Sequence, residues 1–163
     1  MNPHRFLRLA VLSLLAIPRS GFAADDYKLG PDSMPQDGVP RGEVIKMPPW
    51  TNSTVFPGTH RDWWLYVPKQ YDPAKPACVM IFQDGGGYVS TDGQWRVPTV
   101  FDNLIHKKEI PVTIGIFINP GMVPPAEEGQ RGRSNRSFEY DTLSDQYARL
   151  LLEEILPEVG RKS

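Results

Sequence analysis

The sequence predicts an α/β fold, and the prediction depends on two apolar segments and on what lies between them. Residues 78–82 form an uncharged run that leads into an aspartate and three glycines. Residues 112–118 form a second such run, which leads into Asn119-Pro120-Gly121. A helical pattern connects the two runs. Strand, helix and strand with short joints make a βαβ unit, so we expect two parallel strands joined by a right-handed crossover.

The first of these runs ends at the most informative stretch of the chain. Five apolar residues without alternation, 78–82, are typical of a central strand that is covered on both faces. On this prediction Cys78, the single cysteine, is an inert core thiol. Gly85-Gly86-Gly87 then frees the backbone to turn sharply. Open α/β sheets bind ligands at the carboxyl ends of their strands, so this turn is the first candidate site, with a plain tight turn as the alternative.

Length and charge exclude several classes of protein. A chain of 163 residues is expected to form one domain at most. Its 18 basic and 19 acidic residues leave a net charge of −1, without the basic field of a nucleic-acid-binding protein. No His/Cys cluster has metal-site spacing, and the glycine turn lacks both the Lys-Ser/Thr of a phosphate loop and the spacing of a dinucleotide fingerprint. We expect no cofactor and no metal.

The first 23 residues have the pattern of a signal peptide. Arg5 and Arg8 precede an apolar stretch at 9–17 that is too short to span a bilayer, and small residues around Ala23 suit a signal peptidase. A buried amphipathic helix is the alternative. We expect cleavage after Ala23, a secreted or periplasmic location, and no membrane association after cleavage.

The mature chain is predicted to begin with a linker and an antiparallel pair of strands. Residues 24–41 are polar and rich in proline and glycine, which is typical of an extended linker. The folded part, 42–163, starts with a predicted edge strand at 42–47. A second strand at 62–67 is aromatic and β-branched and is ended by a proline. We expect these two strands to pair across the loop between them.

Two helices and a long loop complete the prediction. Pro98 suits the first turn of a helix. The apolar face of that helix consists of Val100, Phe101, Leu104 and Ile105. Residues 122–140 show no hydrophobic period, so we expect a loop that is functional or disordered. Thr142 and Asp145 then have the spacing of a capping box. The stripe of the last helix consists of Leu143, Tyr147, Leu150, Leu151 and Ile155, and Pro157 is expected to kink or end it.

An alternating α/β pattern leads us to expect another parallel strand after this last helix. The sequence instead ends with the polar residues 160–163. We therefore expect a sheet that lacks part of its cover, with exposed apolar surface at Phe117, Leu150 and Leu151.

The order and spacing of these features resemble the putative esterase family, which groups enterochelin esterase-like, feruloyl esterase-like and esterase D-like enzymes. The matching segments are 82–88, 116–121 and 136–141 with its following helix. The resemblance covers residues 42–159. It implies the N-terminal part of an α/β-hydrolase sheet: two antiparallel strands, a parallel βαβ unit and a long helix.

The resemblance also implies a chemical role for the glycine turn. In α/β-hydrolases this turn supplies part of the oxyanion hole, which implies that the backbone N–H groups of Gly86, Gly87 and Tyr88 are its donors. The turn here reads Asp-Gly-Gly-Gly where lipases have His-Gly-Gly-Gly. Arg136 and Tyr140, in the segment predicted to lie opposite, are candidates for substrate contact. A structural salt bridge and a packed aromatic ring are the alternatives.

The catalytic triad of the family is not found in the sequence. Its serine lies in Gly-x-Ser-x-Gly and is followed by an acid and a histidine, and no serine here has that context. His4 belongs to the predicted signal peptide, and His60 and His106 are expected at the surface. We therefore expect an N-terminal fragment of a secreted serine esterase, inactive alone, whose completed form hydrolyses a small-molecule or carbohydrate-linked ester. A non-catalytic exported binding module derived from a hydrolase fold is the alternative.

Overall fold

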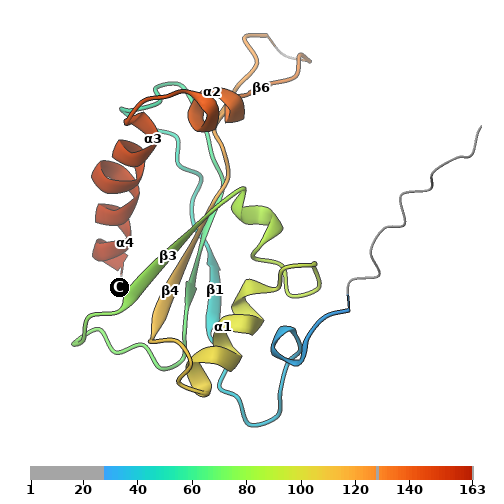
Figure 1. The fold of residues 1–163 in the computed structure, drawn as a ribbon. Helices are drawn as coiled ribbons and strands as arrows, with labels where there is room; N and C mark the ends of the chain where they lie inside the picture. Colours follow the sequence, from blue (N-terminus) through green and yellow to red (C-terminus); the bar gives the residue numbers. More distant parts are fainter. Residues whose placement is uncertain (1–27, 128, 163) are drawn as a thin grey trace, which may run out of the picture.

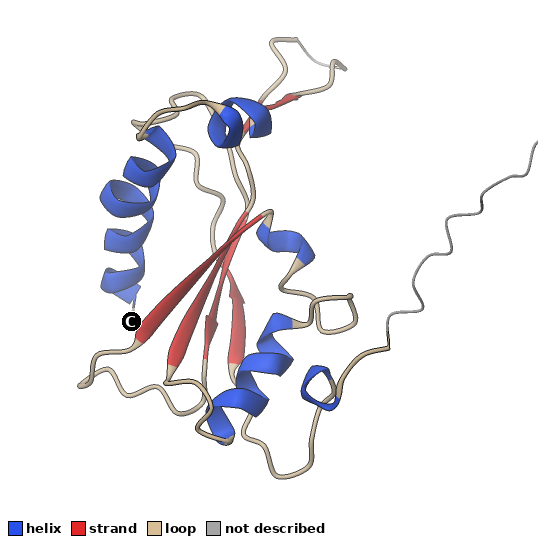
Figure 2. Ribbon diagram, in the orientation of Figure 1, coloured by secondary structure: helices blue, strands red, loops and turns tan. Residues whose placement is uncertain are grey.

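A computed structural model describes residues 28–127 and 129–162, so the predicted signal peptide lies outside the described residues. The structure is a mixed four-stranded sheet with helices on both faces (Figures 1 and 2). In spatial order the strands are β1 (Glu43–Lys46), β2 (Trp63–Val67), β4 (Thr113–Ile118) and β3 (Cys78–Gln83). The predicted α/β class is confirmed. Among the described residues, no helix is long and apolar enough to cross a membrane.

The register of the sheet confirms the predicted pairings. β1 and β2 are antiparallel, with Glu43 opposite Val67, and β3 and β4 are parallel, with Cys78 opposite Thr113. β2 is antiparallel to β4, which places β4 in the interior of the sheet. All six residues of β4 are buried, as its uninterrupted apolar sequence requires.

The predicted position of the first apolar strand is wrong. β3 is the edge strand of the described sheet, because β4 lies between it and β2. Four of its six residues are exposed, and Cys78 is an exposed free thiol rather than a core residue. An apolar run indicates that a strand can be covered on both faces, but it does not say on which side its neighbours lie.

Helices on each face of the sheet bury residues that were expected to be exposed. Leu150 of the C-terminal helices packs with Ile116 and Ile118 on one face, and Phe117 packs with Phe101 on the other. Phe117 and Leu150 have exposed fractions of 0%, and Leu151 is half-buried against the first cluster. The expectation of exposed apolar surface at these positions is therefore wrong. The helices therefore cover both faces of β4, whereas most residues of β3 and all residues of β1 stay exposed at the two edges of the sheet.

Helix α1 (Val97–His106) forms where predicted and buries Phe101 and Ile105. It also buries three polar residues, Thr99, Asp102 and Asn103. The amide of Asn103 donates to the carbonyls of Asp32 and Met34, at 2.8 and 2.9 Å. The N-terminal segment, which includes the short 3₁₀ helix η1 (Pro31–Ser33), therefore lies against α1 instead of forming the free linker expected for it.

The C-terminal third contains more structure than the sequence predicts. The expected loop holds a two-stranded ribbon and a helix. These elements are β5 (Met122–Val123), β6 (Arg133–Ser134) and α2 (Arg136–Asp141). The predicted capping box is wrong: the N-cap position of the last helix is Asp145 rather than Thr142, and Leu143, expected on its apolar stripe, is fully exposed. The last helix begins only after Asp145.

That last helix consists of three segments, α3 (Gln146–Arg149), a π-helical segment η3 (Leu150–Ile155) and α4 (Leu156–Lys162). Pro157 neither ends nor interrupts it. A proline has no N–H for the carbonyl four residues earlier, and its ring collides with that carbonyl in a regular α-helix. The wider π turn just before Pro157, in which the N–H of Leu156 donates to Leu151, gives the chain room to continue.

Candidate active site

The glycine turn lies at the carboxyl end of β3, where the sequence places the first candidate site. Asp84 adopts the left-handed conformation, with φ 54° and ψ 38°, and Gly85–Gly87 form a 3₁₀ turn called η2. Aspartate tolerates this backbone region better than most residues. Gly85 is buried, and a Cβ there would collide with the backbone of Phe117 and Ile118. The close approach of η2 to β4 therefore requires a glycine.

The three N–H groups assigned to an oxyanion hole all have partners within the protein. The N–H of Gly86 donates to the side-chain oxygen of Asn119 at 2.9 Å. The N–H of Gly87 donates to the carbonyl of Asp84, and that of Tyr88 to the carbonyl of Gly85, each at 3.0 Å. Two of the three donors thus serve the turn itself, and only Gly86 is bound by a side chain.

Helix α2 holds Asp84 from the other side. The guanidinium of Arg136 makes a bidentate ion pair with the Asp84 carboxylate, with Nε–Oδ1 at 2.9 Å and Nη2–Oδ2 at 2.7 Å. This hydrogen bond from Arg136 lowers the pKa of Asp84 below its ordinary value. The hydroxyl of Tyr140 accepts the backbone N–H of Asp84 at 3.4 Å, and the Arg136 guanidinium stacks on the Tyr140 ring.

The structure therefore brings both predicted substrate-contact residues to the glycine turn. It shows them as partners of Asp84, which is the alternative considered for them. Arg136 and Tyr140 are one helical turn apart on α2, so one helix face binds both the side chain and the backbone of Asp84. Their function as substrate ligands stays a prediction.

A buried ion pair fixes α2 against the sheet. Arg61 and Glu139 have fully buried side chains and pair through two contacts of 2.9 and 3.1 Å. The Glu139 carboxylate also accepts the N–H of Gly121 at 3.2 Å and the amide of Asn135 at 3.0 Å. Three separate segments thus meet at one carboxylate. Sequence reasoning missed this pair, because nothing local connects residues 78 positions apart.

A series of aromatic rings packs beside the glycine turn. The ring of Phe82 stacks on Phe117 with centroids 4.8 Å apart, and Tyr88 lies 5.5 Å from Phe82. Trp95 follows at 5.4 Å from Tyr88 and is 53% exposed. The series of rings runs from the core under α1 to the surface next to the glycines.

The histidines and serines of the described residues do not form a catalytic pair. His60 is exposed and exchanges backbone hydrogen bonds with Met122, and His106 is exposed at the end of α1, as predicted. The Ser134 hydroxyl accepts the N–H of Arg136 instead of contacting a histidine. Within residues 28–127 and 129–162, no serine hydroxyl is hydrogen-bonded to an imidazole.

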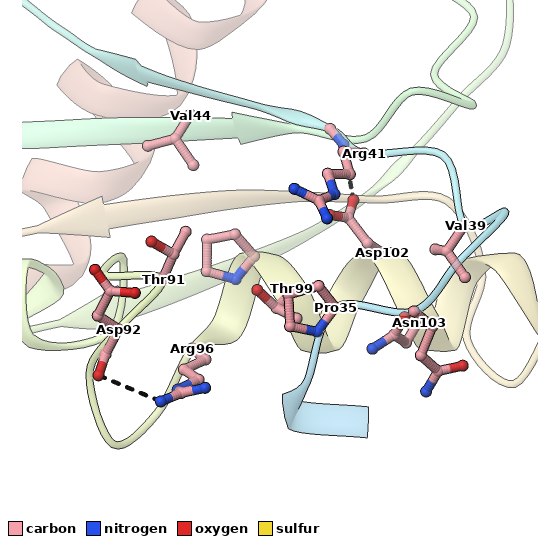
Figure 3. A pocket seen from close by; sticks show the side chains of 13 residues that line it. Pro35, Val39, Arg41, Val44, Thr91, Asp92, Arg96, Thr99, Asp102 and Asn103 are labelled. Carbon is pink, nitrogen blue, oxygen red and sulfur yellow. Dashed lines mark hydrogen bonds between the residues drawn. The ribbon is translucent and has the colours of Figure 1, made fainter. Parts of the chain in front are cut away.

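A hollow lies between the N-terminal segment and α1. It has a volume of about 370 Å³ and is lined by polar side chains that include Arg41, Thr99 and Asp102 (Figure 3). Oδ1 of Asp102 accepts the Tyr66 hydroxyl at 2.6 Å and the Gly42 N–H at 2.8 Å. Burial is the largest of the causes that raise the pKa of Tyr66. This carboxylate joins the N-terminal segment to the sheet through α1.

The mixed sheet, the helices on its two faces and the glycine turn after β3 define a protein of the α/β-hydrolase type. A family model described as "Putative esterase" matches residues 53–162, more than half of the chain. The chain therefore belongs to the putative esterase family. Comparison with curated protein sequences finds no significant match.

Solved structures of feruloyl esterases share the fold. A ferulic acid esterase from Anaeromyces mucronatus in complex with ferulic acid is 20% identical, with a TM-score of 0.52 over 80% of this chain and 46% of that one. The same enzyme without substrate has a TM-score of 0.51 at 20% identity, over 78% of this chain and 46% of that one. A mutant feruloyl esterase module from Clostridium thermocellum, complexed with sinapinate, is 19% identical, with a TM-score of 0.45 over 69% and 38%. The chain spans less than half the length of these structures.

Proposed function

We propose that this chain forms the first part of the catalytic domain of an exported carboxylic-ester hydrolase. The observation that carries the proposal is the glycine turn at the carboxyl end of β3, in a chain of the esterase family. The pattern of residues 1–23 supports export. The solved relatives bind ferulic acid or sinapinate, and the substrate proposed here is the broader class of small-molecule or carbohydrate-linked esters.

The turn contributes to acyl transfer by binding the oxyanion of the tetrahedral intermediate. One backbone donor in such a site lowers the barrier by about 3 kcal/mol. Gly86 is the donor that we propose, because its N–H is held by a side chain, that of Asn119, and not by a backbone carbonyl of the turn. The N–H groups of Gly87 and Tyr88 donate to backbone carbonyls of the turn and are less easily released.

The nucleophile and its base must come from residues that this sequence does not contain. It has no Gly-x-Ser-x-Gly segment, and a serine without a hydrogen-bonded base is a weak nucleophile. We therefore propose that the chain alone does not hydrolyse esters. In the complete enzyme a serine attacks the ester carbonyl, a histidine accepts the serine proton and returns it to the leaving alcohol, and water then releases the acid.

Two measurements test this proposal. The chain and its Gly86→Pro variant are assayed with p-nitrophenyl acetate, and we expect both to match the buffer rate. Hydrolysis by the chain that Gly86→Pro abolishes would contradict the proposed inactivity. The coding DNA beyond the Ser163 codon is also read, and we expect Gly-x-Ser-x-Gly after a short linker and one strand. A reading frame without that motif would contradict the esterase assignment.

The structure also favours a second candidate, a non-catalytic exported binding module derived from a hydrolase fold. The complete burial of Phe117 and Leu150 allows the described residues to form a stable unit by themselves. Thermal unfolding followed by circular dichroism separates the two candidates. A single cooperative transition favours the module, and a broad transition favours an incomplete domain.

A further inference from the structure

The hollow between the N-terminal segment and α1 contains charged side chains that do not pair with one another. Two guanidinium groups, those of Arg41 and Arg96, and two carboxylates, those of Asp92 and Asp102, line it. Within the described part of the chain, none of the four takes part in an ion pair. They are instead spaced around a volume of about 370 Å³, which lies in the range of small-molecule sites.

One of these carboxylates keeps a free acceptor although it is nearly buried. Asp102 is 8% exposed. Its Oδ1 accepts the Tyr66 hydroxyl and the Gly42 N–H, whereas no donor among the described residues reaches its Oδ2. Buried polar atoms almost always have a hydrogen-bond partner. Oδ2 therefore needs a donor that is not part of the described chain, from a bound molecule or from water.

A hydroxyl group on the same helix face is also free. Thr99 lies three residues before Asp102 on α1, so both side chains are on the face that lines the hollow. Thr99 is 8% exposed, and its hydroxyl makes no hydrogen bond to any residue that the structure describes. α1 thus presents one free acceptor and one group that can both donate and accept.

Arginine side chains supply donors around the same space. Figure 3 shows Arg41, from the N-terminal segment, directed toward the part of the hollow where Asp102 projects from α1. The Arg41 guanidinium has no hydrogen-bond partner among the described residues. Arg96 donates from Nε to the carbonyl of Gly93 at 2.8 Å, which holds its guanidinium without neutralising the charge. The donors and acceptors of the hollow therefore lie on opposite walls.

The composition of the lining specifies a neutral molecule with several hydroxyl groups. Two positive and two negative side chains give no net charge, so the hollow does not concentrate ions of either sign. Carboxylates accept hydrogen bonds, guanidinium groups donate them, and a hydroxyl group does both. Aliphatic side chains complete the lining and suit the C–H groups of a saturated ring; they are Pro35, Val39, Val44 and Pro98.

We infer that this hollow is a binding site for one neutral sugar ring, held between α1 and the N-terminal segment. Oδ2 of Asp102 accepts a sugar hydroxyl, the Thr99 hydroxyl bonds a neighbouring one, and Arg41 donates from the opposite wall. No residue of the glycine turn is among those that line the hollow. The inference therefore goes beyond the proposed function and does not depend on ester hydrolysis.

The test is a titration of the chain with D-glucose, D-galactose and D-xylose, each followed by the NMR shifts of the backbone amides. We expect saturable shifts at Gly42, Thr99 and Asp102 for at least one sugar, with a Kd below about 0.1 M. The amides of Gly86 and Gly87 should not move. That pattern places the sugar in the hollow rather than at the glycine turn.

Asp102→Asn isolates the free acceptor. The asparagine oxygen can still accept from Tyr66 and Gly42, while an NH₂ group replaces Oδ2. We expect the circular dichroism spectrum of the parent and an affinity for the sugar that is lower by about tenfold. If this variant does not fold, Thr99→Val replaces it, because valine keeps the shape and removes only the hydroxyl. We expect a loss of about fivefold for Thr99→Val.

A matched pair of arginine variants tests the opposite wall. Arg41→Gln removes a guanidinium that lines the hollow, and Arg131→Gln removes one that is exposed and does not line it. Neither guanidinium has a partner among the described residues, so the two changes should have equal effects on stability. We expect Arg41→Gln to weaken sugar binding by about fivefold and Arg131→Gln to bind like the parent.

Four results would overturn the inference. The absence of a saturable shift with all three sugars would leave the hollow to water. Shifts confined to the glycine turn would place the sugar elsewhere. Parent affinity in Asp102→Asn, Thr99→Val and Arg41→Gln would show that these groups do not bind it. Tighter binding of glycine or sodium acetate than of every sugar, at the same amides, would assign the hollow to a charged ligand. None of these readouts depends on hydrolysis, so a failure here is distinguishable from a failure of the proposed function.

Discussion

Helix α2 takes part in two arginine–carboxylate pairs that look alike and lie in opposite environments. Glu139 pairs with Arg61, and both side chains have exposed fractions of 0%. Arg136 pairs with Asp84, and their side chains are 52% and 42% exposed. Both pairs are bidentate, with the two hydrogen bonds of each pair between 2.7 and 3.1 Å long. The difference is therefore one of solvation rather than geometry.

This difference in solvation determines how much each pair contributes to the stability of the fold. A buried ion pair costs several kcal/mol of desolvation, so removal of one partner leaves a charge without compensation. An exposed pair competes with water and contributes about 0–1 kcal/mol. We therefore expect the Arg61–Glu139 pair to keep α2 in place and the Arg136–Asp84 pair to orient only the glycine turn.

The largest expected effect comes from breaking the buried pair. Glu139→Ala leaves the Arg61 guanidinium buried without its anion and removes the acceptor of the Gly121 N–H. We expect the free energy of unfolding to fall by about 3–5 kcal/mol, measured by urea denaturation. The exposed Glu127→Ala serves as the control and should change stability by less than about 0.5 kcal/mol. A loss below about 1 kcal/mol for Glu139→Ala would show that the pair does not hold α2.

A second buried carboxylate, Glu154, forms no ion pair among the described residues and is bound by neutral donors instead. Glu154 accepts the indole N–H of Trp50 at 3.0 Å, the N–H and hydroxyl of Thr54 at 2.7 and 2.8 Å, and the N–H of Val55 at 2.9 Å. Burial by itself raises its pKa, but these hydrogen bonds outweigh burial and lower it. We expect Glu154→Ala to cost about 1–3 kcal/mol, because several donors lose their acceptor. A cost equal to that of Glu139→Ala in the same urea assay would mean that the cation adds nothing.

The smallest effect is expected for the exposed pair, and its pH dependence identifies it. The pKa of Asp84 is lowered in the folded state. The pair therefore stabilises the fold at pH values above the ordinary pKa of aspartate. This contribution is lost as the pH falls through the folded-state pKa of Asp84. At pH 7, Arg136→Gln should lose no more than about 1 kcal/mol. The difference between Arg136→Gln and the parent should shrink in 1 M salt and vanish once the pH lies below the folded-state pKa of Asp84. A difference that persists at low pH would assign the effect to packing on Tyr140.

Much of the candidate site could be predicted from local sequence, and the missing part has one cause. The strand ending in Asp84, the glycine turn and the helix after Arg136 each have short-range signals: apolar runs, glycines and turn residues. The occupied N–H of Gly86 depends on Asn119, a residue 33 positions away. No single-sequence pattern reports such a pairing. The sequence therefore located the turn and could not say where its donors point.

The amino-acid sequence indicated the positions of the four sheet strands, of the α1 helix and of the glycine turn, because each of these has signals within a few residues: apolar runs, prolines and glycines. Three features are visible only in the folded structure: β3 lies at the edge of the described sheet, the N-terminal segment packs on α1, and Arg61 pairs with Glu139. These three features depend on contacts between segments far apart in the chain. Such contacts form when the whole sheet assembles, and their free energy comes from burial that no local window of sequence contains.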